Sequence, residues 1–230
     1  MEIAQAIKQM HPHTVPGLDG LPLLFYQRFW FFTGNCVTQA ALDFLNHGII
    51  PPNYNDTHIV LIPKVQNPRK IIKYKSISLC NVAYKIASKV VANRLKSVLS
   101  IIVSENQSAF TKGCFITDNV LLVFETMHHI SQKKSSKVGE MAIKLDMSKA
   151  YDMVEWACLE NIMRKMGVHQ KMIEVVMRCI KIVTYSIRIN RQTRGKVVPS
   201  RGLRQGDSLS PYLFLFCVEG LSALLRHATE

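Results

Sequence analysis

The 230-residue sequence has few acidic residues, no closely spaced cysteines and no long apolar segment. Its six cysteines are scattered singly, without a C-x-x-C pair, which argues against a zinc site and against a disulfide framework. No apolar run approaches the roughly 20 residues that a membrane span needs. The nearest, 21–32, is interrupted by Gln27 and Arg28. No signal peptide opens the sequence. These absences predict an intracellular protein of the nucleus or cytoplasm, with reduced thiols and no membrane partner.

The charge of the chain is strongly one-sided. Lysine and arginine number 29 against 16 aspartate and glutamate, which gives a formal net charge of +13. Such an excess favours polyanionic partners through electrostatic attraction and counterion release. The hydrophobic fraction of 48% excludes a disordered chain. A basic globular protein without a nucleic-acid partner would have the same composition, so charge alone does not decide between the two.

Apolar periodicity and turn residues predict an α+β protein. Helices are expected over 1–10, over two stretches of 21–47 broken near Gly34, over 82–102, from about 154 to Gly167, over 171–183 and from Ser210 towards His227. Strands are expected over 57–64, over 141–145, and in a hairpin of 184–190 with 196–200 through the turn 191–195. The polar segment 131–140 is expected to be a loop or hairpin. Because helices and strands do not alternate regularly, a parallel βαβ fold is not expected.

A carboxylate placed directly after a predicted strand is the most informative local feature. Residues 144–152 read KLDMSKAYD, and the apolar residues before Asp146 predict a short buried strand that ends there. Tyr151 follows five residues later. A carboxylate at a strand end, close to an aromatic ring, suits a metal that handles a nucleoside triphosphate. An aspartate that only caps a turn would give the same pattern.

Three further blocks accompany this one in order: YKSISLCNVAYKIASKVVANRL at 74–95, NQSAFTKG at 106–113 and RGLRQGDSLSPYLF at 201–214. Together the four blocks resemble the reverse transcriptases of non-LTR (LINE-type) retrotransposons, most of all those of plants. The resemblance runs from PGLDG at 16–20 to the last residue. It implies a right-hand polymerase fold, with fingers over 1–135 and a partial palm over 136–230, and with the thumb absent.

The resemblance also implies a chemistry, in which two Mg²⁺ ions support addition of dNTPs to a DNA primer along an RNA template. It assigns the metal to the Asp146 carboxylate and the Met147 carbonyl, and it makes Tyr151 the ring that excludes a ribose 2′-hydroxyl. The residues implied in dNTP binding are Lys64, Lys75, Tyr151, Gln205 and Gly206. Those implied in template and primer contacts are Arg94, Lys112, Arg201 and Arg204. From the residues alone, Tyr151 could equally be a core aromatic and each of these four basic residues a solvated surface charge.

The sequence departs from the family pattern at several positions. Lys75 and Cys114 stand where the pattern has arginine, and Leu18 and Ser208 stand where it has proline. The Asp-Asp pair that supplies the other metal-binding carboxylates does not occur in these 230 residues. We therefore expect a truncated domain that is inactive by itself.

Two alternatives stay open. One is a non-catalytic, basic nucleic-acid-binding remnant of a decayed retroelement. The other is a relative of group II intron maturases or telomerase, although SLCNVAYK and ITDN favour plant LINEs. The sequence does not indicate an oligomeric state.

The charge excess generates a first prediction. We expect weak, sequence-tolerant binding to an RNA–DNA hybrid, with an affinity that falls as salt increases, because bound lysines and arginines release counterions from the phosphates. Titration of a labelled hybrid at low and moderate salt measures this dependence. Binding that is indifferent to salt would contradict contacts through basic side chains.

Overall fold

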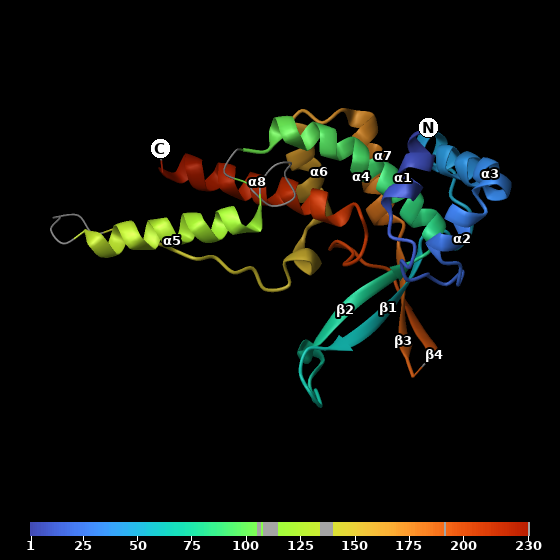
Figure 1. The fold of residues 1–230 in the computed structure, drawn as a ribbon, viewed down its shortest axis with the longest axis horizontal. Coiled ribbons are helices and arrows are strands. Elements are labelled where there is room, and N and C mark those ends of the chain that lie inside the picture. The colour runs from blue at the N-terminus through green and yellow to red at the C-terminus, as the bar shows by residue number, and fades with distance from the viewer. Residues whose placement is uncertain (105–106, 108–114, 134–139, 191, 230) are drawn as a thin grey trace.

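The computed structural model describes residues 1–104, 107, 115–133, 140–190 and 192–229 (Figure 1). Its α-helices are α1 (Glu2–Gln9), α2 (Leu23–Arg28), α3 (Trp30–Leu42), α4 (Val82–Ile102), α5 (Ile116–Gln132), α6 (Trp156–Lys165), α7 (Gln170–Lys181) and α8 (Ser210–Thr229). Three short helical turns are η1 (Asp43–His47), η2 (Ile71–Lys73) and η3 (Ala150–Met153). The strands are β1 (Asp56–Pro63), β2 (Tyr74–Cys80), β3 (Thr184–Ile189) and β4 (Gln192–Val197). The predicted α+β class is confirmed as a mixture of helices with one mixed sheet.

The four strands form one sheet in the order β2-β1-β3-β4. The outer pairs β1–β2 and β3–β4 are antiparallel, whereas the central pair β1–β3 is parallel. Both hairpins project away from the helices (Figure 1). The sheet joins strands from both sides of residue 135, so the division into fingers and palm at that position stays a prediction.

Helix α4 lies at the centre of the hydrophobic core. It contacts α1, α3, α7 and α8, and these neighbours surround much of its surface. Its side chains with no exposed surface are Val82, Tyr84, Ile86, Ala87, Val90, Val91, Ala92 and Leu95, with Ser88 as a buried polar member. The predicted helix over 82–102 is confirmed at both ends. Apolar burial on this scale is the main favourable term in folding.

Asn81, which precedes α4, connects the helix to the loop that contains PGLDG. Its side-chain oxygen accepts a hydrogen bond from the Asp19 amide at 3.2 Å, and its side-chain nitrogen donates to the Asn53 carbonyl at 2.9 Å. Gly17 lies so close to the Asn81 backbone that a Cβ atom would collide with it. The PGLDG block is therefore a packing element of the β2–α4 junction.

The predicted strand over 141–145 is wrong. Residues 141–147 form no strand, and every residue from 140 to 149 is exposed. A strand needs a neighbour to bond its backbone N–H and C=O groups, and none of the four described strands runs beside this segment. The apolar residues indicated the composition of a strand correctly, but they could not indicate whether a pairing partner was available.

Two local predictions also need correction. The break in 21–47 falls at Phe29 and not at Gly34, which lies inside α3 where a Cβ atom would be 2.9 Å from the Trp30 ring. The hairpin after Thr184 is confirmed, but its second strand begins at Gln192, within the expected turn. The predicted loop 131–140 lies largely outside the described residues.

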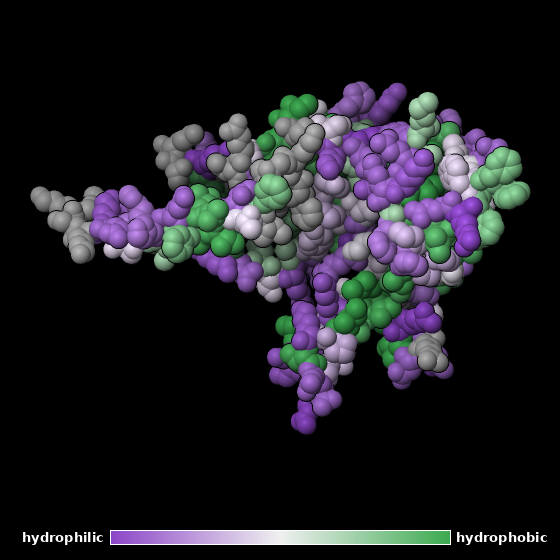
Figure 2. Space-filling view, viewed as in Figure 1, coloured by the Kyte–Doolittle hydropathy of each residue, from purple (hydrophilic) through white to green (hydrophobic). Residues whose placement is uncertain are grey.

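Helix α5 was not predicted, and it forms the long arm on the left of Figure 1. Hydrophobic side chains are visible along this arm in Figure 2. Those with more than half of their surface exposed are Val120, Leu121, Leu122, Val123, Phe124 and Met127. Within the described part of the chain, no helix has the length and apolar character of a membrane span.

The buried histidine of the sheet generates a pH prediction. His58 on β1 is 7% exposed, and its Nδ1 atom has no hydrogen-bond partner among the described residues. Burial, together with nearby Arg188, lowers its pKa from the ordinary value of 6.5. The stability associated with the neutral imidazole is therefore fully present above pH 6.5, and it is lost as the pH falls towards the lowered pKa, because the unfolded chain takes up the proton first.

We expect His58→Leu to flatten the fall in unfolding free energy between pH 7.5 and pH 5.5, measured by urea denaturation. His47→Gln, at an exposed position of η1, is the matched loss of a surface imidazole. An acid dependence in His58→Leu as steep as that of the unmodified protein would contradict this assignment.

Candidate functional site

Two of the four sequence blocks pack directly against each other. The Tyr151 carbonyl accepts a hydrogen bond from the Leu203 amide, and the Val154 carbonyl accepts one from the Gly202 amide, both at 2.8 Å. The Trp156 indole N–H donates to the Gly202 carbonyl, also at 2.8 Å. The turn η3 and the loop 201–207 are therefore one unit, although about fifty residues separate them in the sequence.

This contact requires a glycine at position 202. Gly202 has a φ of +91°, and a Cβ atom there would lie 3.1 Å from the Asp152 carbonyl oxygen. Only glycine adopts such a backbone conformation without strain, and only glycine leaves room for η3. The close approach fixes the distance between the Tyr151 turn and the loop.

Tyr151 is half-buried, and its ring stacks on Phe214 of α8 with 5.0 Å between centroids and 17° between planes. Burial raises the pKa of the phenol, which therefore stays protonated at neutral pH. One face of the ring is thus used in packing, while part of the residue still reaches solvent. The two interpretations of Tyr151, as a core aromatic and as a group that meets a sugar, are compatible with this position.

Gln205 and Gly206 lie at the tip of the loop, against β2. The Gln205 carbonyl accepts a hydrogen bond from the Ser78 amide at 3.0 Å. Gly206 is exposed and has a φ of +104°, and a Cβ atom there would approach the Ser78 carbonyl oxygen to 3.3 Å. The block at 74–95, which includes β2, therefore contacts the block at 201–214, which in turn contacts the block at 144–152.

Arg204 occupies a different environment from the one expected for a template contact. Only 3% of its side chain is exposed, and it forms an ion pair with Asp207 at 3.0 Å. Burial alone would lower its pKa, but Tyr84, Cys80 and Asp207 around it keep the pKa above the ordinary value, so it remains charged. A guanidinium enclosed in this way does not reach a nucleic-acid backbone, and the predicted contact is withdrawn.

Asp146 and Met147 lie in the exposed segment that leads to η3. Lys149, which separates them from η3, has a φ of 52°, an uncommon conformation for a residue other than glycine. The described residues contain no group of three or more histidine, cysteine or acidic side chains placed to hold a metal. One free carboxylate is compatible with a Mg²⁺ that takes its other ligands from phosphates and water, but the described residues do not form a two-metal site.

Lys64 and Lys75 are both exposed on the β1–β2 hairpin. Lys75 pairs with Ile62 in the ladder, and the Lys64 amide donates to the Lys73 carbonyl at 2.8 Å. The structure therefore places these two lysines near each other. Lys75 is three residues from Ser78, about 10 Å along the strand, which separates both lysines from the Gln205 loop.

Of the remaining predicted nucleic-acid contacts, Arg201 lies at the start of the Gln205 loop, whereas Arg94 lies elsewhere. Arg201 is exposed and pairs with Glu155 at 3.0 Å, a surface ion pair of the kind that contributes little to stability. Lys112 lies outside the described residues. Arg94 donates two hydrogen bonds of 2.7 Å to Glu2. Lys64, Lys75, Tyr151, Gln205 and Gly206 all lie on the segments that surround β2 and η3.

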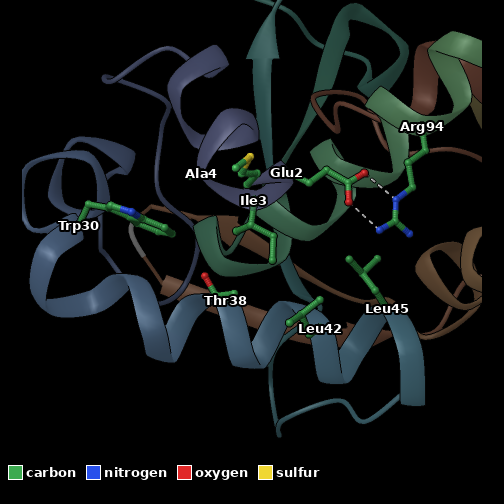
Figure 3. A pocket seen from close by; sticks show the side chains of 9 residues that line it. Glu2, Ile3, Ala4, Trp30, Thr38, Leu42, Leu45 and Arg94 are labelled. Atoms are coloured by element: carbon green, nitrogen blue, oxygen red, sulfur yellow. Dashed lines mark hydrogen bonds and ion pairs between the residues drawn. The ribbon is translucent and has the colours of Figure 1, made fainter.

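The Arg94–Glu2 pair borders a cavity of about 500 Å³ among the amino-terminal helices. Figure 3 shows the pair at one side and Trp30, Thr38, Leu42 and Leu45 along the others. None of the other predicted site residues lines this cavity. Its lining is mostly apolar, and it belongs to the packing of α1 against α3 and α4.

The sequence did not predict the buried groups that hold the loop 201–207 in place by contacting Arg204. Tyr84, Asn55 and Cys179 all contact the Arg204 side chain, yet they lie in three separate parts of the sequence. A partial signal was present, because Arg204 and Asp207 are oppositely charged, three residues apart, and flanked by Leu203 and Leu209. That pattern is typical of a buried pair as much as of an exposed turn.

The glycine contact generates a third prediction. Gly202→Ala is expected to destabilise the protein more than Gly167→Ala, measured by urea denaturation. Both residues have positive φ, which costs an L-residue roughly 1–2 kcal/mol, but nothing lies within 4 Å of a Cβ atom at Gly167. The excess loss at position 202 measures the contact with η3. Equal losses would show that this contact is not tight in solution.

Comparison with known proteins shows which family the sequence resembles. Residues 62–230 match the family described as reverse transcriptase (RNA-dependent DNA polymerase). The chain is 29% identical over 225 residues to the transposon TX1 uncharacterized 149 kDa protein of Xenopus laevis, covering 98% of this chain and 17% of that protein. It is 27% identical over 218 residues to a retrovirus-related Pol polyprotein from a type-1 retrotransposable element R2 of Nasonia vitripennis, covering 94% of this chain and 20% of that polyprotein.

A shorter likeness reaches a plant protein. Over 42 residues, 18% of this chain, it is 64% identical to an uncharacterized mitochondrial protein of Arabidopsis thaliana, of which this stretch covers 34%. A plant origin does not follow from so short a match. The chain spans about a fifth of the length of the two longer relatives. The chain belongs to the reverse transcriptase family, as a domain similar to those of non-LTR retrotransposons of the R2 and TX1 type.

Proposed function

We propose that this domain takes part in RNA-templated DNA synthesis and that it binds the incoming dNTP between η3, the Gln205 loop and the β1–β2 hairpin. The observation that carries the proposal is the docking of η3 onto the loop through two backbone hydrogen bonds of 2.8 Å. This contact joins the block that contains Asp146 to the block that contains Gln205. Each block has a residue implied in nucleotide binding, so their contact supports a shared site.

Within this site the half-exposed side chains of Tyr151 and Gln205 would meet the sugar and base. Lys64 and Lys75 would meet the phosphates, because they are exposed and no acidic residue of the described chain forms an ion pair with either. Figure 2 shows hydrophilic side chains at the tip of this hairpin. A lysine meets a phosphate as a point charge and lacks the planar fork of arginine, so Lys75 gives a weaker grip than arginine would.

Asp146, with the Met147 carbonyl, is the proposed contribution of this segment to Mg²⁺ binding. A magnesium ion bound with a nucleotide takes one or two carboxylates together with phosphate oxygens and water. When bound, such an ion neutralises charge on the triphosphate. The exposed position of Asp146 leaves its carboxylate open to solvent and available for this role.

The template and primer are proposed to bind through exposed basic residues. Arg201 lies beside the Gln205 loop, and Lys112 belongs to the block at 106–113. Arg94 is a weaker candidate, because both of its hydrogen bonds to Glu2 would have to compete with a phosphate. Such contacts would position the nucleic acid without reading its sequence.

A chimera tests the proposed function directly. Residues 1–230 would replace the matching segment of the Nasonia R2 polyprotein, and primer extension on an RNA template would be measured with the parent polyprotein as reference. We expect extension by the chimera and a loss on the order of 10²-fold or more in Asp146→Asn, because metal positioning is lost. Asp152→Asn, an exposed carboxylate six residues away, is the matched control.

Extension that survives Asp146→Asn would remove Asp146 from the metal site. A chimera that binds the RNA–DNA hybrid but extends no primer would favour the alternative of a non-catalytic binding module.

The position of Tyr151 generates a separate prediction in the same chimera. Tyr151→Ala is expected to reduce the preference for dNTPs over rNTPs, because the ring that would obstruct a 2′-hydroxyl is removed. Tyr151→Phe keeps the ring and its stacking on Phe214, and it should keep the preference. The measurement is the ratio of kcat/KM for a dNTP to that for the matching rNTP. An unchanged ratio in Tyr151→Ala would leave the ring with a packing role alone.

A further inference from the structure

The guanidinium of Arg204 lies at the junction of the sheet and the helices. Its hydrogen-bond partners are the Asn55 side chain, Thr57 Oγ1 at 3.5 Å, Cys80 Sγ at 3.8 Å, the Tyr84 hydroxyl and the Cys179 carbonyl at 3.0 Å. These partners belong to β1 and the residues before it, to β2, to α4 and to α7. One buried side chain thus connects the loop 201–207 to four parts of the fold.

Asp207 completes the arrangement on the other side of the loop tip. Its Oδ2 atom lies 3.0 Å from Arg204 and accepts a hydrogen bond of 3.0 Å from the Tyr84 hydroxyl. Its Oδ1 atom accepts from the Leu209 amide at 3.1 Å, just before α8 begins. Both oxygens of the carboxylate are therefore used, one towards the core and one towards α8.

Tyr84 connects the two charged residues. It has no exposed surface, its hydroxyl contacts both Arg204 and Asp207, and its ring lies 4.1 Å from the guanidinium carbon. Burial raises its pKa well above the ordinary value, so the hydroxyl remains a hydrogen-bond donor at neutral pH. The ring also offers its negative face to the cation.

Only Gln205 and Gly206 stand between the two charged anchors. Arg204 and Asp207 are buried, whereas Gln205 is half-buried and Gly206 is exposed. The tip is joined to β2 by the hydrogen bond from the Ser78 amide to the Gln205 carbonyl, at 3.0 Å. The anchors therefore set where the tip lies relative to β2.

A buried ion pair is not an efficient way to stabilise a fold, because desolvation of both charges offsets much of their attraction. The ion pair instead fixes the orientation of the loop, because each hydrogen bond of the guanidinium and the carboxylate has a preferred geometry. We propose that Arg204, Asp207 and Tyr84 are positioning residues, which hold the Gln205–Gly206 tip on β2 so that Gln205 faces the incoming nucleotide. The last clause rests on the proposed function, whereas the positioning of the tip does not.

Hydrogen exchange of the 230-residue protein, followed by NMR, tests the positioning. The variant is Tyr84→Phe, which removes the hydroxyl shared by both charges and keeps the ring. Its matched control is Tyr54→Phe, because Tyr54 is also buried, contacts Tyr84 edge-on and donates its hydroxyl to the Ala83 carbonyl at 2.8 Å, away from the loop. Asp207→Asn is the second variant, which keeps an acceptor for the Leu209 amide and removes the charge.

We expect the Ser78 amide to exchange about tenfold faster or more in Tyr84→Phe and Asp207→Asn, while the amides that join β1 to β2 change little, because a local opening is affected and not the global one. Tyr54→Phe should leave the ratio of these rates unchanged. A uniform acceleration of all amides, or an unchanged Ser78 rate, would overturn the positioning role and leave the network as an ordinary part of the core.

The R2 chimera separates this inference from the proposed function. If Gln205 serves the nucleotide, Tyr84→Phe should raise KM for dNTP by about tenfold, as expected for one lost hydrogen bond, with a smaller change in kcat. A selective rise in Ser78 exchange with an unchanged KM would support the positioning of the tip and contradict the role of Gln205 in nucleotide binding. A changed KM without selective exchange would overturn the positioning and leave the proposed function standing.

Discussion

The buried charge of Arg204 is the constraint on which the rest of the site depends. A guanidinium removed from water must have its hydrogen-bonding capacity satisfied, or the fold is strongly destabilised. Its partners come from the sheet, α4, α7 and the loop itself, so one side chain joins all of these parts. The apolar core around α4 explains why the helices pack together. The Arg204 contacts explain why the loop lies against Ser78 of β2.

The loop that Arg204 anchors also connects β2 to η3. The loop 201–207 contacts β2 at its tip and η3 at its start, where Gly202 leaves room for the turn. Trp156 closes the contact by its bond to the Gly202 carbonyl, and α6 begins at the same residue. The turn that carries Tyr151 is thus held by the loop and by α6, while the segment before it, with Asp146, has no such support among the described residues. The contacts that hold this site therefore lie at the loop and at η3, whereas Asp146 lies in an exposed segment.

Much of the fold was predictable from local patterns, for reasons that particular elements illustrate. Helix 82–102 has a long apolar face, and strand 57–64 ends at a proline, so both were placed closely. Residues 141–145 have the same apolar character as a strand, but pairing depends on a neighbour that local sequence does not specify. Helix α5 was missed because its apolar residues are exposed and do not form the one-sided apolar pattern that predicts a packed helix.

The candidate site shows the same division between local and non-local information. The blocks at 144–152 and 201–214 indicated the relevant segments, but not which of their residues would be buried. Arg201 and Arg204 are three positions apart and were given the same role, yet one is exposed beside Glu155 and the other is enclosed with Asp207. The difference arises from Tyr84 and Asn55, which are more than a hundred residues away in the sequence.

A motif shared with a family therefore contains two kinds of residue. Some meet the substrate, and others build the surface that presents them. In this chain Arg204, Asp207 and Gly202 belong to the second kind by their burial and contacts. Asp146, Lys75 and Arg201 are exposed and Tyr151 and Gln205 are half-exposed, so these groups of the same blocks remain open to a ligand. The basic residues also divide into these two kinds. A buried cation that is paired with an acidic residue, such as Arg204 with Asp207, adds little to the electrostatic field at the surface. The proposed attraction for a polyanion would then come from exposed residues such as Lys64 and Lys75, which form no ion pair within the described chain.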